Sequence, residues 1–502
     1  MAKYSAADIS LQGAFGVGRL RTLSLEAGVN RHAVLTYSGY IDESAGGSLA
    51  ERKTQGEQMA LEIGGTPVFR GVVSSVEVSV DNGLFILTVS CVSSSKLTDL
   101  TPHSRSFQDV RMSYGEMLER VYQAADDASI ITPGGDCRIG APLLQYQETD
   151  WAYTLRMAGR IGVTVVPNLT AQGAQVSFGL PKGNRYTVSP AETEYMIQRR
   201  NMHYIRSNLE YDDTRYRDFL QYTIRDSRLF RLGDRITIQD EELSVVELRI
   251  WMESGLVESE YLLGRERAFC APRRNNEIQA GLTLSGTVLD TEGQTVKVHL
   301  DIDEEQEKSK AYSFPYAPQT NNGMYCMPQI GTKVMLRWKS GQDGDAVAIH
   351  CIRTNSIGDY NYRYFTTEFG KQLAMLPAAL SFSGDSNSVK LQDSSGIAVK
   401  TSGHISLKAA KLLKIHSLKH VVIKTPELIK FSKAGTDAAI DVSGGNMHLH
   451  APKVFVHGNL KGRILPAKPV YKRPLRMISA QLIAAAAGMI ANGMSDPSKE
   501  EF

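Results

Sequence analysis

The sequence lacks the short motifs by which most catalytic sites are recognised. It has no His-Glu-x-x-His zinc motif, no Gly-x-x-x-x-Gly-Lys phosphate loop and no Gly-x-Ser-x-Gly nucleophile elbow. The adjacent carboxylates of Asp212 and Asp213, and of Glu241 and Glu242, would face opposite sides of a strand and cannot share a substrate. We therefore expect a protein that is not an enzyme.

Cysteine pairs and a strong charge imbalance are also missing. The five cysteines show no Cys-x-x-Cys spacing, which fits assembly in a reducing cytoplasm. The chain has 56 Lys and Arg against 54 Asp and Glu, a balance that gives no support to nucleic acid as a partner. The residues after Met1 contain no apolar signal core, so the protein would need another route to leave a cell.

What the chain does have is an apolar residue at every eighth position between residues 389 and 431. Two such series, offset by two residues, comprise Val389, Ile397, Ile405, Leu413, Val421 and Ile429, and Leu391, Val399, Leu407, Ile415, Ile423 and Phe431. We call these twelve residues the apolar ladder. Apolar residues spaced by two share one face of a strand, so the period predicts a short strand repeated with intervening turns.

Each repeat is too short to enclose a core within one chain. Two inward side chains and a turn need neighbouring copies to cover them. We therefore expect three intertwined chains whose ladders face a common axis, which is a triple-stranded β-helix in a homotrimer. Residues 389–433 hold nine lysines against Asp393 and Glu427. These lysines are either a solvated outer face that keeps the rod soluble or a contact surface for an anionic envelope or tube lining.

The N-terminal region reads as β-sheet. Alternating and β-branched residues run from position 20 to position 92, with Gly64-Gly65 and Asp81-Asn82-Gly83 placed as turns. Two short helices follow. Ser113 and Glu116 predict a capping box for the first, and Thr149 or Asp150 caps a second helix that Gly162 ends.

Residues 281–354 form a separate pattern of five short strands, expected at 282–289, 295–300, 311–314, 333–338 and 346–352. Five strands in this length suit an OB-fold barrel. The connection that begins at Asp301 is acidic and would repel a phosphate backbone, so we expect a solvated loop and no nucleic-acid binding.

Several of these segments resemble one known family. The features are an Ile63-Gly hairpin followed by Arg70-Gly-Val-Val, then Arg105-Ser-Phe-Gln, then Gln145-Tyr-Gln-Glu-Thr-Asp-Trp-x-Tyr, and finally Pro328-x-x-Gly-x-x-Val. In this order they resemble VgrG proteins of type VI secretion and phage late-control D proteins. The resemblance implies a hub of β-barrel domains with short helices, an OB-fold barrel and a β-helical spike.

The expected division of the chain follows from these patterns. It comprises a hub at residues 1–275, an OB fold at 281–354, a linker at 355–388, a triple-stranded β-helix at 389–465 and a tail with a helix at 466–502. The tail helix, near residues 476–494, is short for a membrane span, and polar residues and glycines interrupt its apolar sequence. We expect it to dock cargo or a tip protein through Leu482, Ile483, Met489 and Ile490, with membrane insertion and a flexible end as alternatives.

One metal site is a candidate. His448 and His450 alternate along a strand, so both imidazoles share one face. If the period of eight continues from Ile440 and Val442, the two histidines occupy the next ladder positions and face the axis. Three chains would then supply six imidazole nitrogens, an octahedral set of ligands for iron or another transition metal. Choosing Met447 and Leu449 as the apolar pair instead places the histidines outside.

The function that the resemblance implies is mechanical. The chain would be the hub and spike at the tip of a contractile injection machine, would contact the inner tube and baseplate, and would carry effectors or a PAAR-like tip protein into a target cell. A phage tail and an extracellular contractile particle remain alternatives to type VI secretion. A glycan-cleaving trimeric tailspike and a membrane-inserting pore are alternatives of other classes.

Overall fold

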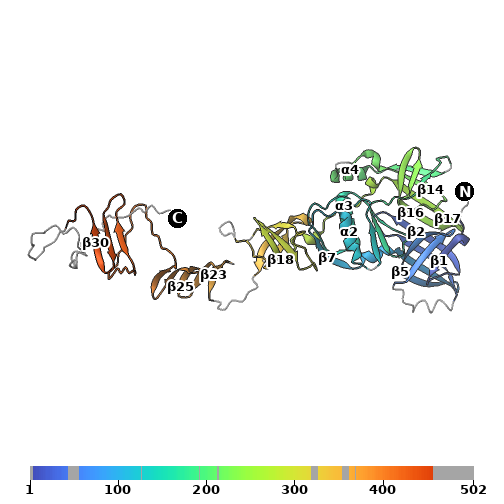
Figure 1. Cartoon of the computed structure of the whole chain (residues 1–502). Coiled ribbons are helices and arrows are strands. Elements are labelled where there is room, and N and C mark those ends of the chain that lie inside the picture. The colour runs from blue at the N-terminus through green and yellow to red at the C-terminus, as the bar shows by residue number, and fades with distance from the viewer. Residues whose placement is uncertain are drawn as a thin grey trace, which may run out of the picture. The chain divides into compact units, whose positions relative to one another are not determined.

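The computed structural model describes residues 4–42, 56–125, 127–191, 193–211, 214–317, 326–352, 361–367 and 369–455. The chain divides into two compact units, Met1–Ser356 and Ile357–Phe502, and each is described by itself. Figure 1 shows that strands dominate both units. The expectation of a mainly β protein is confirmed.

A twelve-stranded sheet is the largest element of the first unit. Its main path runs β1-β4-β5-β6-β3-β2-β16-β17-β14-β13, and β15 joins β12 to β16. The strands are β1 (Ile9–Gly13), β2 (Arg19–Gly28), β3 (Val34–Ile41), β4 (Gln58–Ile63), β5 (Thr66–Asp81), β6 (Leu84–Ser93), β12 (Arg185–Thr187), β13 (Glu194–Arg199), β14 (Leu220–Arg225), β15 (Arg235–Ile238), β16 (Glu241–Glu253) and β17 (Leu256–Gly264). Residues from its two halves, such as Leu35 and Val245, share one buried core.

The turns of this sheet lie where the glycines predict them. Gly64 and Gly65, between β4 and β5, have φ of +58° and +74°, and Asn82 and Gly83, between β5 and β6, have φ of +50° and +78°. Glycine adopts positive φ at little cost, and paired positive φ values are the geometry of tight hairpins.

Two helices and two small sheets form a second core in the first unit. The elements are β7 (Pro102–Phe107), α2 (Tyr114–Gln123), β8 (Ala128–Ile131), β9 (Leu143–Thr149), α3 (Asp150–Ile161), β10 (Val165–Pro167) and β11 (Ala174–Phe178), with α4 (Asn201–Glu210) further along the chain. The predicted caps are confirmed: Ser113 and Glu116 form the capping box of α2, Thr149 accepts from the backbone N–H of Ala152, and Gly162 ends α3 with left-handed geometry.

Five strands follow as a distinct sheet with its own core. They are β18 (Thr283–Glu292), β19 (Thr295–Leu300), β20 (Ser313–Pro315), β21 (Lys333–Trp338) and β22 (Ala346–Ile352), in the order β20-β19-β18-β21-β22. A parallel bridge between Tyr316 and Ala348 connects the two ends of this order. Three of the five strands, β19, β21 and β22, begin and end at the predicted residues. Strands β19 and β21 alternate more and less buried side chains along their whole length, whereas β22 begins with three buried residues in succession.

Short 3₁₀ turns connect these elements. They are η1 (Ala6–Asp8), η2 (Ser94–Asp99), η3 (Tyr216–Phe219), η4 (Glu266–Phe269), η5 (Glu277–Gln279) and η6 (Asp343–Asp345). The last two lie at the contact between the helical part and the five-stranded sheet, as described below.

The second unit contains two antiparallel sheets. One is built from β23 (Arg363–Thr366), β24 (Gln372–Leu376), β25 (Ala379–Gly384), β26 (Asn387–Gln392) and β27 (Gly396–Lys400), and the other from β28 (Ile429–Ser432), β29 (Ala439–Ser443) and β30 (Asn446–His450). The first sheet corrects the interpretation of residues 355–388 as a linker. Backbone hydrogen bonds from β24 to β26 make this segment part of the same sheet as the first ladder residues.

The predicted tail helix and its docking residues Leu482, Ile483, Met489 and Ile490 lie outside the described residues. Within the part of the chain that the structure describes, no helix is both long and apolar enough to cross a membrane.

Candidate functional site: an exposed apolar ladder and a buried arginine junction

The first ladder residues lie together on one face of the β23–β27 sheet. Val389 is opposite Val399, and Leu391 is opposite Ile397. On the other side of β26, Phe382 is opposite Val389 and Leu380 is opposite Leu391. Residues that are opposite each other across antiparallel strands share a face, so these side chains form one continuous apolar surface.

This apolar surface is exposed in the single chain. Val389 and Leu391 are 36% and 37% exposed, and Ile397 and Val399 are 73% and 53% exposed. Lys390, between Val389 and Leu391, is less exposed than either neighbour and faces the other side of the sheet, opposite Ala398. A soluble sheet normally has the reverse arrangement, since leaving an apolar side chain in water costs about 1.5 to 3 kcal/mol relative to burial. The sheet therefore exposes a continuous apolar surface in the single chain.

The middle of the ladder is exposed as well. Ile405, Leu407, Leu413, Ile415, Val421 and Ile423 are each between 49% and 69% exposed. No strand is assigned within residues 401–428 of the single chain, although repeated strands were predicted there. A strand needs backbone hydrogen bonds to a neighbouring strand. A repeat of eight residues with two apolar side chains is too short to provide that neighbour within one chain.

The last ladder residues pair with the β29–β30 hairpin, and this pairing sets the orientation of the two histidines. Ile429 is opposite Val442, which is opposite Met447, and the same face carries Phe431. His448 is opposite Asp441, so it lies on the other face, and His450 follows with the same phase.

The two histidines share a face that carries neither residue of the apolar pair Ile440 and Val442. His448 and His450 lie on the face opposite Ile440 and Val442, as in the alternative phase in which Met447 and Leu449 continue the apolar face. The Nε2 atom of His450 is 3.4 Å from an Asp441 carboxylate oxygen. Among the described residues, no group of three or more His, Cys, Asp or Glu side chains is arranged to hold a metal ion.

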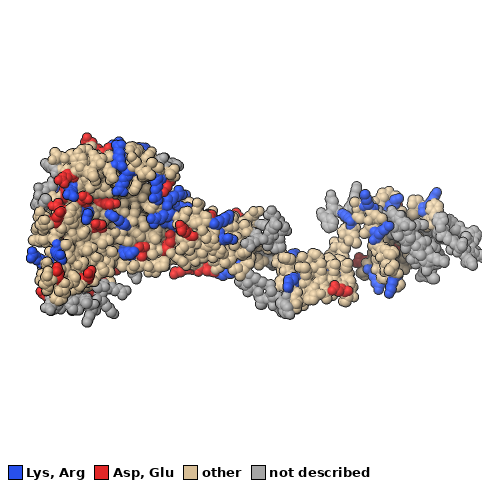
Figure 2. Space-filling view, turned by 180° about the vertical axis from the view of Figure 1, so that it is seen from behind, with Lys and Arg blue, Asp and Glu red and all other residues tan. Residues whose placement is uncertain are grey.

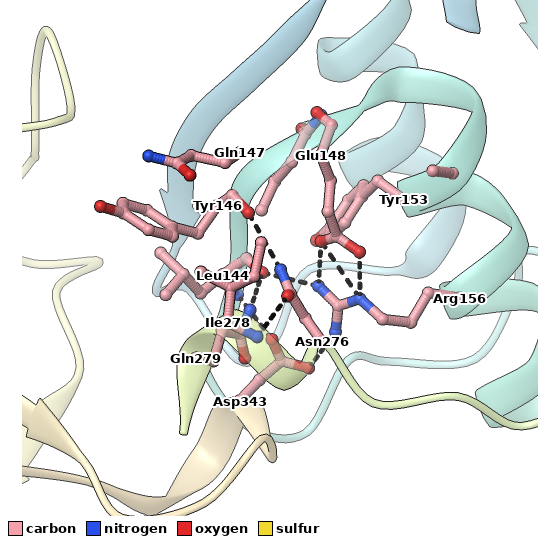
Figure 3. Close-up of polar contacts among 12 residues, drawn as sticks. Leu144, Tyr146, Gln147, Glu148, Tyr153, Arg156, Asn276, Ile278, Gln279 and Asp343 are labelled. Carbon is pink, nitrogen blue, oxygen red and sulfur yellow. Dashed lines mark hydrogen bonds and ion pairs between the residues drawn. The ribbon is translucent and has the colours of Figure 1, made fainter. Parts of the chain in front are cut away.

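A second feature is a buried arginine between α3 and the five-stranded sheet (Figure 3). Arg156 donates from Nε and Nη2 to the two carboxylate oxygens of Glu148 at 2.9 and 2.8 Å, and from Nη1 to Asp343 at 2.7 Å. Its Nη2 also donates to the carbonyl oxygen of Leu144 at 2.7 Å. Arg160 reaches the same Asp343 oxygen at 3.0 Å. Two carboxylates from different parts of the chain thus converge on one guanidinium.

The electrostatics of this junction follow from its burial. The Arg156 side chain is only 5% exposed and that of Asp343 only 3%. Burial alone would lower the pKa of Arg156, but the charges of Asp343 and Glu148 outweigh it and raise the pKa above its usual value. The guanidinium stays charged, and its planar fork matches the carboxylate geometry.

Amide side chains complete the contact between the two parts. Gln108 donates to the carbonyl oxygen of Val298 at 3.0 Å and accepts from the backbone N–H of Tyr312 at 3.2 Å. Gln279 donates to the carbonyl oxygen of Leu144 at 2.8 Å, and Asn276 donates to that of Tyr146 at 2.9 Å. The five-stranded sheet is therefore attached to the helical part by directional bonds from several segments.

Two of the segments that carry the family resemblance lie at this junction. Arg105-Ser-Phe-Gln contributes Gln108, and Arg105 itself pairs with the buried Asp150 at 2.6 Å. The side chain of Gln145 donates to the same Asp150 oxygen at 2.9 Å. These residues are structural. Sequence reasoning recognised the motifs but not the partners Asp343 and Arg156, which are 187 positions apart.

The acidic loop after β19 reaches the contact through Asp303, whereas Asp301, Glu304, Glu305 and Glu307 are exposed, as the prediction of a solvated loop expects. Asp303 accepts from the backbone N–H of Ser106 at 2.7 Å and from its hydroxyl at 2.5 Å. Burial raises the pKa of Asp303, although the hydrogen bonds from Ser106 and the charge of His299 act in the opposite direction. Asp301, two residues earlier, has its pKa lowered by the hydrogen bonds from Lys333 and Ser285.

These opposite shifts predict opposite pH dependences. A carboxyl group with a raised pKa in the folded state stabilises it at low pH, and this contribution is lost as the pH rises through the folded pKa. We expect the melting temperature of Asp303→Asn, relative to the unmodified protein, to increase as the pH goes from about 4 to about 7. Asp301→Asn is the matched control. The contribution of a carboxyl group with a lowered pKa is present above its unfolded pKa of about 4 and is lost as the pH falls through the folded pKa. The relative melting temperature of Asp301→Asn should therefore change little between about pH 4 and about pH 7, and should rise as the pH falls below about 4. Parallel melting curves for the two variants would contradict this assignment.

No protein-family model and no curated protein sequence matches this chain. Solved structures that are similar to it include components of phage tails and of type VI secretion systems. One is the 43 kDa tail protein of prophage MuSo2 from Shewanella oneidensis, with 11% identity, a TM-score of 0.42, and coverage of 54% of this chain and 100% of that one.

Two further structures come from secretion systems. The c3393 protein of E. coli is described as a type VI secretion component similar to T4 tail proteins gp27 and gp5. It has 11% identity, a TM-score of 0.47 and coverage of 69% of this chain and 99% of that one. The Francisella PdpA-VgrG complex has 8% identity, a TM-score of 0.47 and coverage of 78% and 88%. We base the proposed function on this chain's own residues.

Proposed function

We propose that this chain is the hub and spike of a contractile injection machine, similar to VgrG, and that it acts as a homotrimer. The observation that carries the proposal is the apolar ladder. Its twelve residues recur with a period of eight and are largely exposed in the single chain. A surface of this kind is stable only when copies of itself cover it, and three chains around one axis are the simplest closed arrangement.

The five-stranded sheet forms the collar between hub and spike in this proposal. Its order, β20-β19-β18-β21-β22, and the parallel bridge between Tyr316, just after β20, and Ala348 in β22 support the proposal that this sheet is an OB-fold barrel. The junction around Arg156 would then transmit force from the hub to the collar, because a buried, multiply bonded contact resists displacement better than an exposed one.

The role is mechanical and not catalytic. A rod in which every repeat is held by interchain burial fails only when many contacts break together. Sheath contraction would push this rod through a target envelope. The inner tube protein, baseplate components, a PAAR-like tip protein and effectors are the partners that this role implies, and the protein would move from the cytoplasm to the outside or into a target cell.

Electron microscopy of particles isolated from producing cells tests this proposal. With an antibody against the chain, label should lie at one end of the inner tube, at the baseplate. Label along the sheath, or no association with any tube, would refute the role. The host particle also distinguishes type VI secretion from a phage tail or an extracellular contractile particle.

A transition metal near the end of the rod stays a prediction. His448 and His450 share one strand face, and in a trimer six imidazoles would be available for iron or a similar ion. Elemental analysis of the purified protein, compared with His448→Ala/His450→Ala, decides between the two phases. Metal at one ion per trimer that disappears in the double variant would support the site, and equal trace metal in both proteins would exclude it.

A further inference from the structure

The lysines of residues 389–433 differ in kind from the cations in the rest of the chain. Arginine outnumbers lysine overall, by 32 to 24, yet this segment contains nine lysines and no arginine. The only carboxylates in it are those of Asp393 and Glu427. Surfaces that serve solubility alone normally mix both charge signs. The exclusion of arginine and the shortage of acids need a separate explanation.

Three of the nine lysines lie in strands, and all three are on the face opposite the apolar ladder. Lys390 is opposite Ala398 and Lys400 is opposite Ser388, both on the other side of the sheet from Val389 and Leu391. Lys430 is opposite Asp441, on the other side from Ile429 and Phe431. In Figure 2, blue side chains outnumber red ones on the visible face of the second unit.

The eight-residue period aligns several of these cations. Lys400, Lys408 and Lys424 occupy the same position of successive repeats, and His416 fills the intervening one. This column of basic residues lies one position after the second ladder series. The side chains of residues 402–428 are exposed throughout. A chain wound with two copies would present three such columns along the outside of one rod.

We propose that this lysine surface binds anionic lipid headgroups during passage of the spike through a membrane. The inference rests on the proposed trimeric spike and adds its partner. A lysine ammonium is a compact, hydrated point charge, whereas arginine makes forked, bidentate bonds to phosphate. Lysine therefore attracts a phosphate-bearing surface without holding individual headgroups in fixed geometry, and each lysine near such a surface adds to a readily reversible attraction.

Nucleic acid is a poorer fit to the same charges. Single-stranded binding surfaces place aromatic side chains next to the cations for base stacking, and specific duplex contacts favour arginine. Phe431 is the only Phe, Tyr or Trp in residues 389–433, and it belongs to the apolar face; the other rings in this segment are the imidazoles of His404, His416 and His420. A lysine surface without Phe, Tyr or Trp beside its cations suits an extended layer of headgroups.

The test uses the full-length chain and sedimentation with vesicles of phosphatidylcholine, with and without phosphatidylglycerol. The variant is Lys400→Gln/Lys408→Gln/Lys424→Gln, and the control is Lys182→Gln/Lys310→Gln/Lys339→Gln, which removes the same charge from exposed lysines of the first unit. We expect binding only to the anionic vesicles, weakened roughly tenfold or more by the first triple variant and little by the control. Lys→Arg at the same three positions should retain binding.

Equal weakening by both triple variants, or binding to duplex DNA without binding to anionic vesicles, would overturn the proposal. Light scattering on the same samples gives the number of chains per particle, so failure of the lipid-binding proposal can be distinguished from failure of the proposed trimeric spike. A trimer that does not bind vesicles contradicts the lysine surface alone, whereas a monomer that binds anionic vesicles contradicts the trimer alone.

Discussion

Ile405→Asp should abolish the trimer. Ile405 is 58% exposed in the single chain and lies in the middle of the apolar ladder, so in the proposed rod three copies of it meet near the axis. Three carboxylates would then be buried close together without partners, at a cost of several kcal/mol for each. We expect a monomer by light scattering and loss of any heat-resistant trimer band in gel electrophoresis.

Ser406→Asp is the matched control because it places the same charge one residue away. A neighbouring residue in a strand faces the opposite side, so this carboxylate would lie outside the rod among lysines. Ser406→Asp should remain trimeric and keep its melting temperature. If Ile405→Asp also remains a heat-resistant trimer, the ladder does not form the trimer core.

Arg156→Met should have the second largest effect, on the stability of the first unit. It leaves the carboxylates of Glu148 and Asp343 buried without their common cation, and breaking a buried ion pair from one side costs about 3 to 5 kcal/mol. The free energy of unfolding in urea, monitored by tryptophan fluorescence, measures the loss. Trp338 is a suitable reporter, since its indole N–H donates to the carbonyl oxygen of Asp343 at 3.1 Å.

Arg111→Met provides the comparison. Arg111 also pairs with an aspartate, Asp109, at 2.9 Å, but its side chain is 65% exposed. Exposed ion pairs contribute about 0 to 1 kcal/mol, so this variant should unfold almost as the unmodified protein does. A loss of the same size in both variants would mean that the Arg156 junction contributes no more than a surface pair.

The local elements were predictable because their signals are local. Strand β19 follows an alternation that is complete within Thr295–Leu300, and the capping box of α2 needs only Ser113 and Glu116. The shared face of the first and last ladder residues was predictable for the same reason, since the spacing of two is visible without any partner, whereas the strands predicted for residues 401–428 are not assigned in the single chain. These patterns establish elements and faces, and they leave open what each face contacts.

The rest depends on residues that are distant in sequence. Asp343 and Arg156 form one contact across 187 positions, and Asp303 and Ser106 form another across 197. Nothing near Asp303 distinguishes it from the solvated acids beside it. The sheet before the ladder did have a signal that was missed: Leu373 and Met375, and Leu380 and Phe382, have the same spacing of two as the ladder pairs.

Electron cryomicroscopy of the purified full-length protein tests the central claim most directly. The account predicts a particle of three chains in which Ile405 and Leu407 of every chain face a common axis and Lys408 faces solvent. A monomeric or dimeric particle, or a trimer whose ladder side chains point into solvent, would contradict it.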